Sequence, residues 1–528
     1  MTGQPETSEV VVYSNDWTDP DNIAGLKFLS ELAKSRSHIH LVIVFEPRPV
    51  DFSLVTLKPD DRAQLDSLLK NNFGHLGTPL EIRLNGLLTD MDLDEGFSKE
   101  DQDLLRMAIN HSKGSREDSE LHASLMARDV ARCFNEPPGS FRRGTKATIL
   151  VDRDAISDAS PVNLKCHAQE QLFNRSPEAI REFYGFMELP EEADRRQETR
   201  EWYKKQIKEV DEKLRGSDIS VGDLDFGDLT DKIRDAERVT FVEGASFKLL
   251  RRLIDEKDVA AKIDCVAQAG SLDLRENIFK NQFNIALDTE SAYYVLHNPQ
   301  LFRSFAAVPT HTSKPISFSL DRLEESGFSS LAKWILCFNH RQDPLNVAER
   351  NVTLTGQYRD VTIKLPDLAM ILLRFNSAVY PREESKFMVE TIEEESLLFV
   401  KSNDDRGVAA WLPKDGHDYG TVDLIISNEL GDFACFTAEE VGRERAILHV
   451  VQAALVVARC APYLMVNSSR NGQIIHVQRG RCAEVGGSIL LPAHEERIKG
   501  IDFPSEDQVV RKSAASATEW FGLGHLLD

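Results

Sequence analysis

The sequence lacks the cysteine patterns that mark disulfide-bonded or zinc-binding domains. Its seven cysteines are scattered, none of them forms a CxxC pair, and their number is odd. The first residues, Met-Thr-Gly-Gln-Pro-Glu, have neither the basic stretch nor the apolar stretch of a secretory signal. We therefore expect reduced thiols and a cytoplasmic protein.

Positive charge and long apolar runs are also scarce. The chain has 63 Lys and Arg against 86 Asp and Glu, a formal net charge of −23, so we expect no nucleic-acid partner. Its most apolar stretch, residues 446–466, is interrupted by His449 and Arg459, which predicts a buried helix and no membrane span. What remains is a globular chain of 528 residues, 41% of them hydrophobic, whose acidic surface suits a cation or a neutral small molecule.

The order of apolar segments indicates an α/β fold. Residues 9–13 and 39–45 are buried strand patterns, and the helical spacing at 23–33 lies between them. Strand, helix and strand in this order form a βαβ unit, which implies a parallel sheet. The same pattern returns at residues 239–267. We expect a mostly parallel sheet flanked by helices, with a Rossmann-like core.

Two parts of the chain fit this pattern less well. Residues 90–235 contain one strand-like run and a highly charged helix, so we expect a helical insertion there, with residues 172–216 exposed outside the sheet. From residue 355 onward the strands follow their own pattern. The sequence therefore predicts a first domain at 1–354, which carries the insertion, and a C-terminal α+β extension at 355–528.

The first strand is followed by a loop with three carboxylates, Asp16, Asp19 and Asp21. Such a loop lies at the carboxyl end of a parallel strand, where α/β sheets bind their ligands, and the mutual repulsion of the carboxylates favours a bound cation. Alternatively, Asp19 or Asp21 caps the helix that opens near Asn22. Composition alone leaves both interpretations open.

Four segments carry a more specific signal. Residues 14–22 (SNDWTDPDN) are similar to the loop D-x-D-P-G-x-D-D of nucleoside hydrolases, and residues 282–292 (QFNIALDTESA) are similar to that family's A-E-F-N-I-x-x-D-P-E-A-A. Residues 239–250 resemble its segment ending in G-P-L-T-N, and residues 341–348 (RQDPLNVA) resemble its H-D-P-x-A-V-A. Their order and spacing together suggest a divergent member of the inosine/uridine-preferring nucleoside hydrolases, with a nucleoside hydrolase-like core.

The resemblance implies a calcium-dependent hydrolase that cleaves the N-glycosidic bond of ribonucleosides or a related N-riboside. Asp16 would be the catalytic residue, which binds calcium and deprotonates the attacking water. The other positions that correspond to metal ligands, or that could compensate for one, are Asp19, Asn22, the carbonyl of Phe247 and Asp343. The positions that correspond to substrate-binding residues are Asp21, Asn277, Gln282, Asn284 and Gln342.

This sequence departs from the family at three polar positions. Asn22 stands where the family has a second aspartate, Gln282 replaces a glutamate, and Gln342 replaces a histidine proposed as the leaving-group acid. His340 is close enough in sequence to act instead, or it is a structural histidine. We therefore expect calcium to be weakly held or lost. An alternative function is a catalytically inactive relative that acts as a binding or regulatory module. The expected partner is a nucleoside or riboside, and a homo-oligomer stays open.

Overall fold

The computed structural model describes most of the chain up to residue 437 and three short strands beyond it. The described residues are 9–16, 20–35, 38–47, 50, 52–58, 60–61, 63–64, 67, 98–104, 114–134, 147–156, 167–217, 219–274, 281–319, 329–338, 342–350, 352, 362–375, 380, 382–392, 396–402, 407–414, 421–427, 432–437, 464–468, 475–479 and 488–489.

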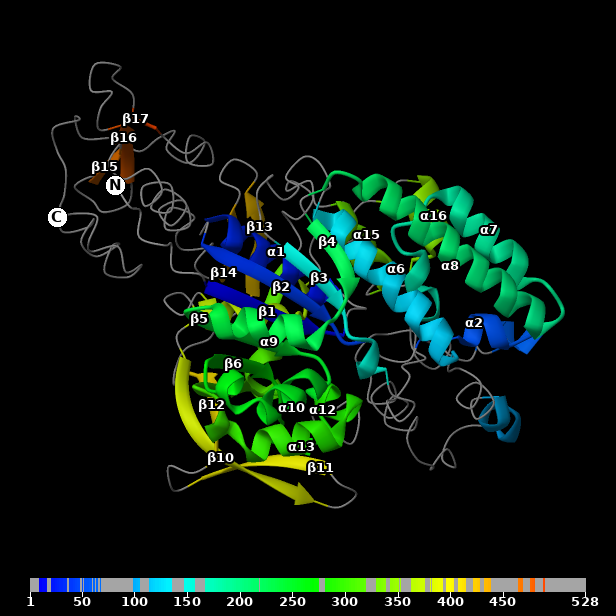
Figure 1. Ribbon diagram of the computed structural model, residues 1–528. Helices are drawn as coiled ribbons and strands as arrows, with labels where there is room; N and C mark the ends of the chain where they lie inside the picture. The colour runs from blue at the N-terminus through cyan, green and yellow to red at the C-terminus, as the bar shows by residue number, and fades with distance from the viewer. Residues whose placement is uncertain are drawn as a thin grey trace.

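A ten-stranded sheet forms the centre of the molecule (Figure 1), and its strand order is β11-β10-β12-β7-β6-β5-β1-β2-β3-β4. From β12 to β4 every neighbouring pair is parallel, whereas β10 is antiparallel to both β11 and β12. The predicted α/β fold with a mostly parallel sheet is confirmed. The strands are β1 (Glu9–Asn15), β2 (Ile39–Phe45), β3 (Ala147–Val151), β4 (Ile219–Asp223), β5 (Arg238–Gly244), β6 (Ile263–Gln268), β7 (Ser304–Val308), β10 (Arg382–Ile392), β11 (Ser396–Lys401) and β12 (Val408–Pro413).

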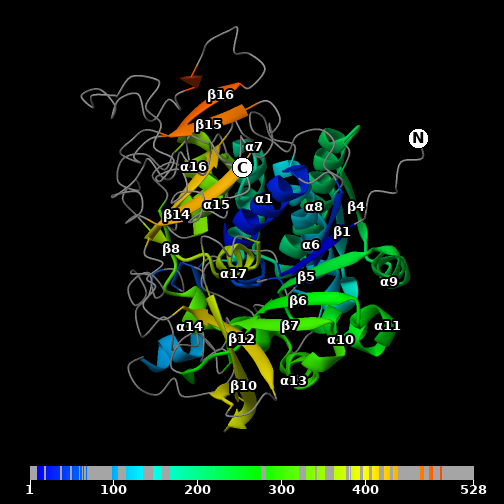
Figure 2. The ribbon, with the colours of Figure 1, turned by 90° about the vertical axis from the view of Figure 1, so that its left-hand side faces the viewer.

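Helices cover both faces of this sheet (Figure 2). One core contains Val11 and Tyr13 of β1 and lies under α1 (Pro20–Ser35), α6 (Arg116–Phe134), α15 (Ser329–Phe338) and α17 (Pro366–Phe375). The other contains Val10 and Val12 and lies under α9 (Phe226–Asp235), α10 (Lys248–Asp255) and α13 (Thr289–His297). Successive side chains of a strand point to opposite faces, so a strand covered on both sides must be apolar throughout. This explains the continuous runs in β1 and β2.

Shorter elements complete the fold. The helices are α2 (Ser53–Thr56), α11 (Lys257–Ala260), α12 (Phe283–Leu287), α14 (Thr310–Ser313) and α16 (Pro344–Arg350), with 3-10 turns η1 (Arg153–Ala155), η2 (His167–Leu172) and η4 (Pro299–Leu301). A second sheet has the order β14-β13-β8-β9, and a third has the order β15-β16-β17. Their strands are β8 (Ser317–Ser319), β9 (Thr362–Ile363), β13 (Thr421–Ser427), β14 (Asp432–Thr437), β15 (Leu464–Ser468), β16 (Ile475–Arg479) and β17 (Ser488–Ile489). Of the helices in the described ranges, none is long and apolar enough to cross a membrane.

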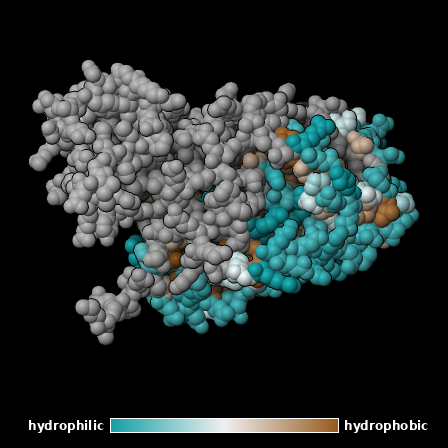
Figure 3. Space-filling view, turned by 90° about the horizontal axis from the view of Figure 1, so that it is seen from above, coloured by the Kyte–Doolittle hydropathy of each residue, from teal (hydrophilic) through white to brown (hydrophobic). Residues whose placement is uncertain are grey.

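The region expected to be an insertion contributes to the main fold. It supplies two strands of the sheet, β3 and β4, together with α7 (Pro177–Met187) and α8 (Glu192–Leu214). The outer surface on the side of α7 and α8 is hydrophilic, as predicted (Figure 3). Their inner faces, however, place Phe183, Trp202 and Tyr203 in the core under α6. Residues 172–216 thus lie outside the sheet, but only the outer faces of their helices are exposed.

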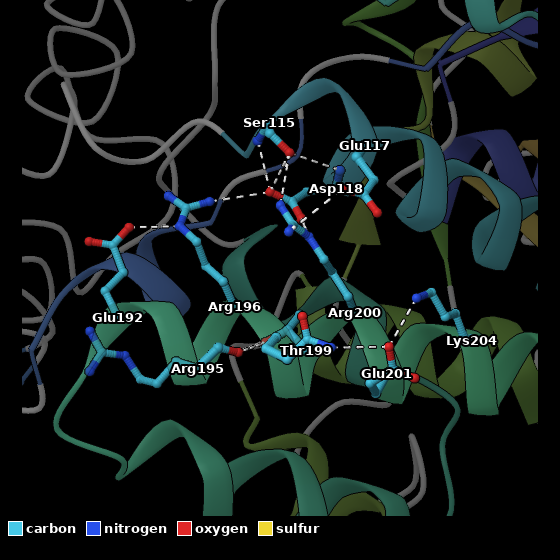
Figure 4. A network of polar contacts seen from close by, with 11 residues as sticks. Ser115, Glu117, Asp118, Glu192, Arg195, Arg196, Thr199, Arg200, Glu201 and Lys204 are labelled. Atoms are coloured by element: carbon cyan, nitrogen blue, oxygen red, sulfur yellow. Dashed lines mark hydrogen bonds and ion pairs between the residues drawn. The ribbon is translucent and has the colours of Figure 1, made fainter.

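A polar network also ties α8 to α6 (Figure 4). The buried carboxylate of Asp118 accepts hydrogen bonds from Arg200 Nε at 2.7 Å and from Arg196 Nη1 at 3.2 Å. The backbone N–H of Ser115 donates to the same carboxylate at 2.9 Å and so fixes the start of α6. A buried carboxylate needs such partners, since burial without them is costly.

The main sheet continues across the domain boundary expected at residue 354. Helix α17 packs on α1 and β6, and β10, β11 and β12 form one end of the main sheet. The C-terminal extension expected from residue 355 therefore shares its first elements with the N-terminal fold. The helix expected within residues 446–466 lies mostly outside the described residues.

Candidate functional site

A cluster of polar side chains lies where β1 ends. Tyr13 is fully buried, and its hydroxyl oxygen is 2.9 Å from Asn22 Oδ1 and 2.7 Å from Asp367 Oδ2. Asn22 in turn donates from Nδ2 to Asp16 Oδ1 at 3.2 Å. Asp16 is the first residue after β1 and is 2% exposed. The hydroxyl and the amide thus link two buried carboxylates from distant parts of the sequence.

Asp21 joins this cluster to the start of α17. Its Oδ1 accepts a hydrogen bond from the backbone N–H of Asn22 at 3.1 Å, and its Oδ2 accepts one from the N–H of Asp367 at 3.2 Å. The first turns of α1 and α17 therefore meet here. Helix N-termini carry partial positive charge, so they stabilise carboxylates at this position. Asp21 therefore caps α17, whereas the alternative interpretation of the loop expected Asp19 or Asp21 to cap the helix that opens near Asn22.

A second acidic group lies beside the cluster, at the ends of β2 and β5. Ser14 and Ser246 donate hydrogen bonds to the two carboxyl oxygens of Glu46, each at 2.5 Å. Burial raises the pKa of Glu46 to about 7, although both hydroxyls favour its ionised form. Burial also raises the pKa of Glu243 well above its usual range, with a further contribution from the charge of Glu46. This part of the sheet edge therefore holds carboxyls that keep a proton more readily than ordinary glutamates do.

The backbone that follows Glu243 is constrained. Glu243 Oε1 accepts a hydrogen bond from the N–H of Ala245 at 2.7 Å. Phe247 follows with a φ of 66°, in the left-handed region that a residue with a side chain rarely adopts, and it is the N-cap of α10. Strained backbone of this kind is often found at functional sites. The position is the one whose carbonyl the resemblance assigns to the metal.

Two of the residues predicted to bind substrate, Asn284 and Gln282, lie near the end of β6. Asn284 donates from Nδ2 to the carbonyl of Gln268, the last residue of β6, at 3.1 Å. Gln282 caps α12, since its side chain accepts a hydrogen bond from Ile285 N–H at 3.3 Å. Both residues are buried at this edge of the sheet. Asn277, Asp19 and His340 lie outside the described residues.

Asp343 makes its hydrogen bonds to its own helix, α16, and to α7. Its Oδ1 accepts hydrogen bonds from the N–H groups of Leu345 at 2.8 Å and Asn346 at 3.1 Å, at the start of α16. Its Oδ2 accepts one from the Tyr184 hydroxyl of α7 at 3.2 Å. None of these partners belongs to the cluster at the end of β1, and the neighbouring Gln342 is half-buried. The expected convergence of Asp343 with Asp16 stays a prediction, since these contacts do not fix the distance between the two carboxylates.

Three contributors to the site were missed by the sequence analysis: Tyr13, Glu46 and Asp367. Tyr13 and Glu46 do carry a signal, since each is a polar group at the end of a buried strand. Asp367 carries the signal of a helix start, because it follows Pro366 at the opening of α17. Its packing against α1 is what brings it to Asp21, and that contact spans 346 residues of sequence.

Within the ranges that the structure covers, no group of three or more His, Cys, Asp and Glu side chains is placed to hold a metal ion. Asn22 directs its amide nitrogen to Asp16, and its oxygen is engaged by Tyr13. These neutral donors bind carboxylate oxygens that a cation would otherwise bind, so the cluster as described is a poor fit for calcium.

Comparisons with known proteins give distant likenesses. No protein-family model matches the chain. A curated protein, the short-chain dehydrogenase/reductase ascJ of Acremonium egyptiacum, is 55% identical over 42 residues, which span 8% of this chain and 14% of that protein. So short a match assigns no function.

Likenesses to solved structures are distant as well. The inosine-uridine preferring nucleoside hydrolase from Bacillus anthracis has a TM-score of 0.37 at 11% identity, over 77% of this chain and 94% of that one. The purine-preferring ribonucleoside hydrolase from Gardnerella vaginalis has a TM-score of 0.41 at 8% identity, over 77% and 94%. The type III effector protein XopQ complexed with adenosine diphosphate ribose has a TM-score of 0.35 at 9% identity, over 76% and 89%. At these scores the likenesses by themselves assign neither a family nor an activity.

Proposed function

We propose that the cluster at the end of β1 binds a nucleoside or related N-riboside and hydrolyses its N-glycosidic bond, with Asp16 as the residue that activates water. The observation that carries this proposal is the meeting of three carboxylates, those of Asp16, Asp21 and Asp367, at one edge of a parallel sheet. This is the edge at which α/β proteins bind ligands.

The chemistry of the cluster suits this reaction. Cleavage of a glycosidic bond develops positive charge on the sugar ring, and nearby carboxylates stabilise that charge. Carboxylates also accept hydrogen bonds from sugar hydroxyls. Asp16 is held by Asn22, so one of its oxygens has a fixed direction. The cluster therefore has the groups to bind a ribose and to accept a proton from water.

Two features predict a slow enzyme. Gln342 cannot donate a proton to the leaving base, and general acid catalysis is typically worth about 10²–10⁴-fold. The hydrogen bond from Asn22 to Asp16 also competes with a metal ion for that carboxylate. We infer that calcium is weakly bound, and that substrates with an activated leaving group react best.

The test compares four proteins: the wild type, Asp16→Asn, Gln342→His and the control Asp235→Asn. Asp235 is exposed at the end of α9, so this control makes the same chemical change away from the cluster. Rates are measured on inosine, uridine and p-nitrophenyl riboside. We expect slow release of nitrophenol by the wild type and the control, and none by Asp16→Asn. Fast inosine cleavage by the wild type would contradict the absence of an acid.

A second candidate function is binding without catalysis, and it is favoured because both carboxyl oxygens of Asp343 already accept hydrogen bonds from protein groups. Calorimetric titration with inosine and with ribose separates the two. Binding that Asp16→Asn weakens, without any turnover, would show a binding module. Titration of Asn22→Asp with calcium tests the metal: tighter binding than in the wild type is expected if the loop can hold calcium at all.

A further inference from the structure

A pocket of about 770 Å³ lies at the opposite edge of the main sheet from Asp16. It is lined by Asp264 near the start of β6 and Ser304 at the start of β7, whereas Asp16 follows the end of β1. Because these strands are parallel, their starts and their ends lie at opposite edges. The other walls come from η4, the end of α13, the end of α17, and strands β10 and β12. Of these, α13, β10 and β12 lie in the lower part of Figures 1 and 2.

The pocket gathers positive charge in a chain whose net charge is −23. Its lining contains three cationic side chains, Arg303, Arg374 and Lys386, against two carboxylates, Asp264 and Glu384. Two of these groups neutralise one another, since Arg303 binds Asp264 through both Nε, at 2.8 Å, and Nη2. This leaves two cations, Arg374 and Lys386, against one exposed carboxylate, Glu384.

Arg374 and Lys386 are the available cations. Arg374 reaches Thr240 Oγ1 at 3.3 Å, and its Nη2 is 3.9 Å from the already occupied Asp264 Oδ2. Burial lowers the pKa of Arg374, because the pocket wall removes its guanidinium from water. The ammonium of Lys386 makes no hydrogen bond or ion pair within the described part of the chain, although the residue is half-buried. A partly buried cation without a counter-ion is an arrangement that an anion stabilises.

Several of the other lining residues are apolar, among them Phe302, Phe305, Val408 and Trp411. Met388 also lines the pocket and is 46% exposed, an unusual exposure for a large hydrophobic side chain in the described residues. A pocket with both apolar walls and charged groups suits an amphipathic small molecule, and this volume is in the usual range for small-molecule sites.

We propose that this pocket binds a small organic carboxylate, with the anionic group held by Arg374 and Lys386 and an apolar body against Phe305 and Met388. A planar guanidinium matches a carboxylate with two parallel hydrogen bonds, and the ammonium adds a mobile point charge. The proposal is independent of the reaction at the other edge of the sheet, because none of the residues that line the pocket belongs to the cluster at Asp16.

The test uses a matched pair of probes on the full chain. Decanoate and decanol have the same apolar length and differ in charge. Each is titrated against the protein with bound anilinonaphthalene sulfonate, and displacement of the dye is followed by its fluorescence. We expect decanoate to bind at least tenfold more tightly than decanol, because a charge-assisted contact is worth about a factor of ten or more. Added salt should weaken decanoate alone.

Variants locate the binding. Lys386→Gln should weaken decanoate about tenfold and leave decanol within about threefold, because only the charged contact is lost. Lys213→Gln is the control, since Lys213 is exposed on α8 and the chemical change is the same. Equal affinity for the two probes, or equal decanoate binding by both variants, would overturn the proposal. Unchanged thermal unfolding of Lys386→Gln shows that the variant is folded.

Discussion

Replacement of Glu46 by glutamine should stabilise the protein at alkaline pH. Glu46 is 2% exposed, and both of its oxygens accept hydrogen bonds from serines. Its pKa is about 7 in the folded state against an ordinary value of 4.5. Glutamine has the same shape and no charge, and a serine hydroxyl can accept a hydrogen bond from its amide. Glu46→Gln therefore keeps the packing and removes the ionisation.

The direction of the pH effect follows from the raised pKa. Below pH 4.5 Glu46 is protonated in both the folded and the unfolded state, so its ionisation has no effect on stability. As the pH rises from 4.5 to about 7, the unfolded chain loses the proton while the folded chain keeps it, and the free energy of unfolding falls. Above pH 7 the full loss is about 3 kcal/mol. The variant should thus equal the wild type at pH 4.5 and exceed it by up to about 3 kcal/mol at pH 8.

Urea denaturation from pH 4.5 to 8 measures this difference. The control is Glu198→Gln on the exposed face of α8, which should follow the wild type at every pH. Glu243 is coupled to Glu46, so part of the gain comes from easier ionisation of Glu243. A gain of equal size at pH 4.5 and pH 8, or a loss at pH 8, would refute the reasoning, because neither depends on an ionisation.

Three further substitutions test the fold by urea denaturation. Tyr13→Phe should lower the free energy of unfolding by about 1–3 kcal/mol, because the carboxylate and the amide that its hydroxyl bridges stay buried; an unchanged midpoint would mean that water replaces the hydroxyl. Asp129→Asn should cost about 3–5 kcal/mol, since it leaves the buried guanidinium of Arg175 without its counter-ion, and a second change of Arg175→Met should recover part of the loss. Gly270→Ala should lower the free energy of unfolding by more than about 1 kcal/mol, because φ is +89° and a Cβ would meet the Phe399 ring at 2.5 Å. Gly185→Ala is the control, and equal effects of the two substitutions would contradict this.

The fold could be predicted where the chain is buried on both sides. The runs at 10–13 and 41–45 are apolar at every position because helices cover both faces of the sheet there. Prediction was weaker for α8, where charged residues hide the inner face. Trp202 and Tyr203 were the available signal, since adjacent large aromatics in a charged helix indicate one packed side.

The candidate site could be predicted only where it is local. Asp16, Asp21 and Asn22 follow one strand and open one helix, so the pattern of β1 and α1 is enough to place them together. No local pattern marks Asp367 as a site residue, because it lies beside a proline at the start of a helix, as Asp343 also does. Asp residues are common at such positions for capping alone, and Asp343 does cap α16.

Packing decides where Asp367 lies. Every residue of α17 from Leu368 to Leu373 is buried, and the helix lies against α1 and β6. Its axis is thereby fixed, and its first turn has to meet the first turn of α1, where Asp21 receives the N–H of Asp367. Helix α16 instead packs on α7 and α15, which directs its first turn to Tyr184. The position of Asp367 in the site is therefore specified by the hydrophobic residues that follow it along α17.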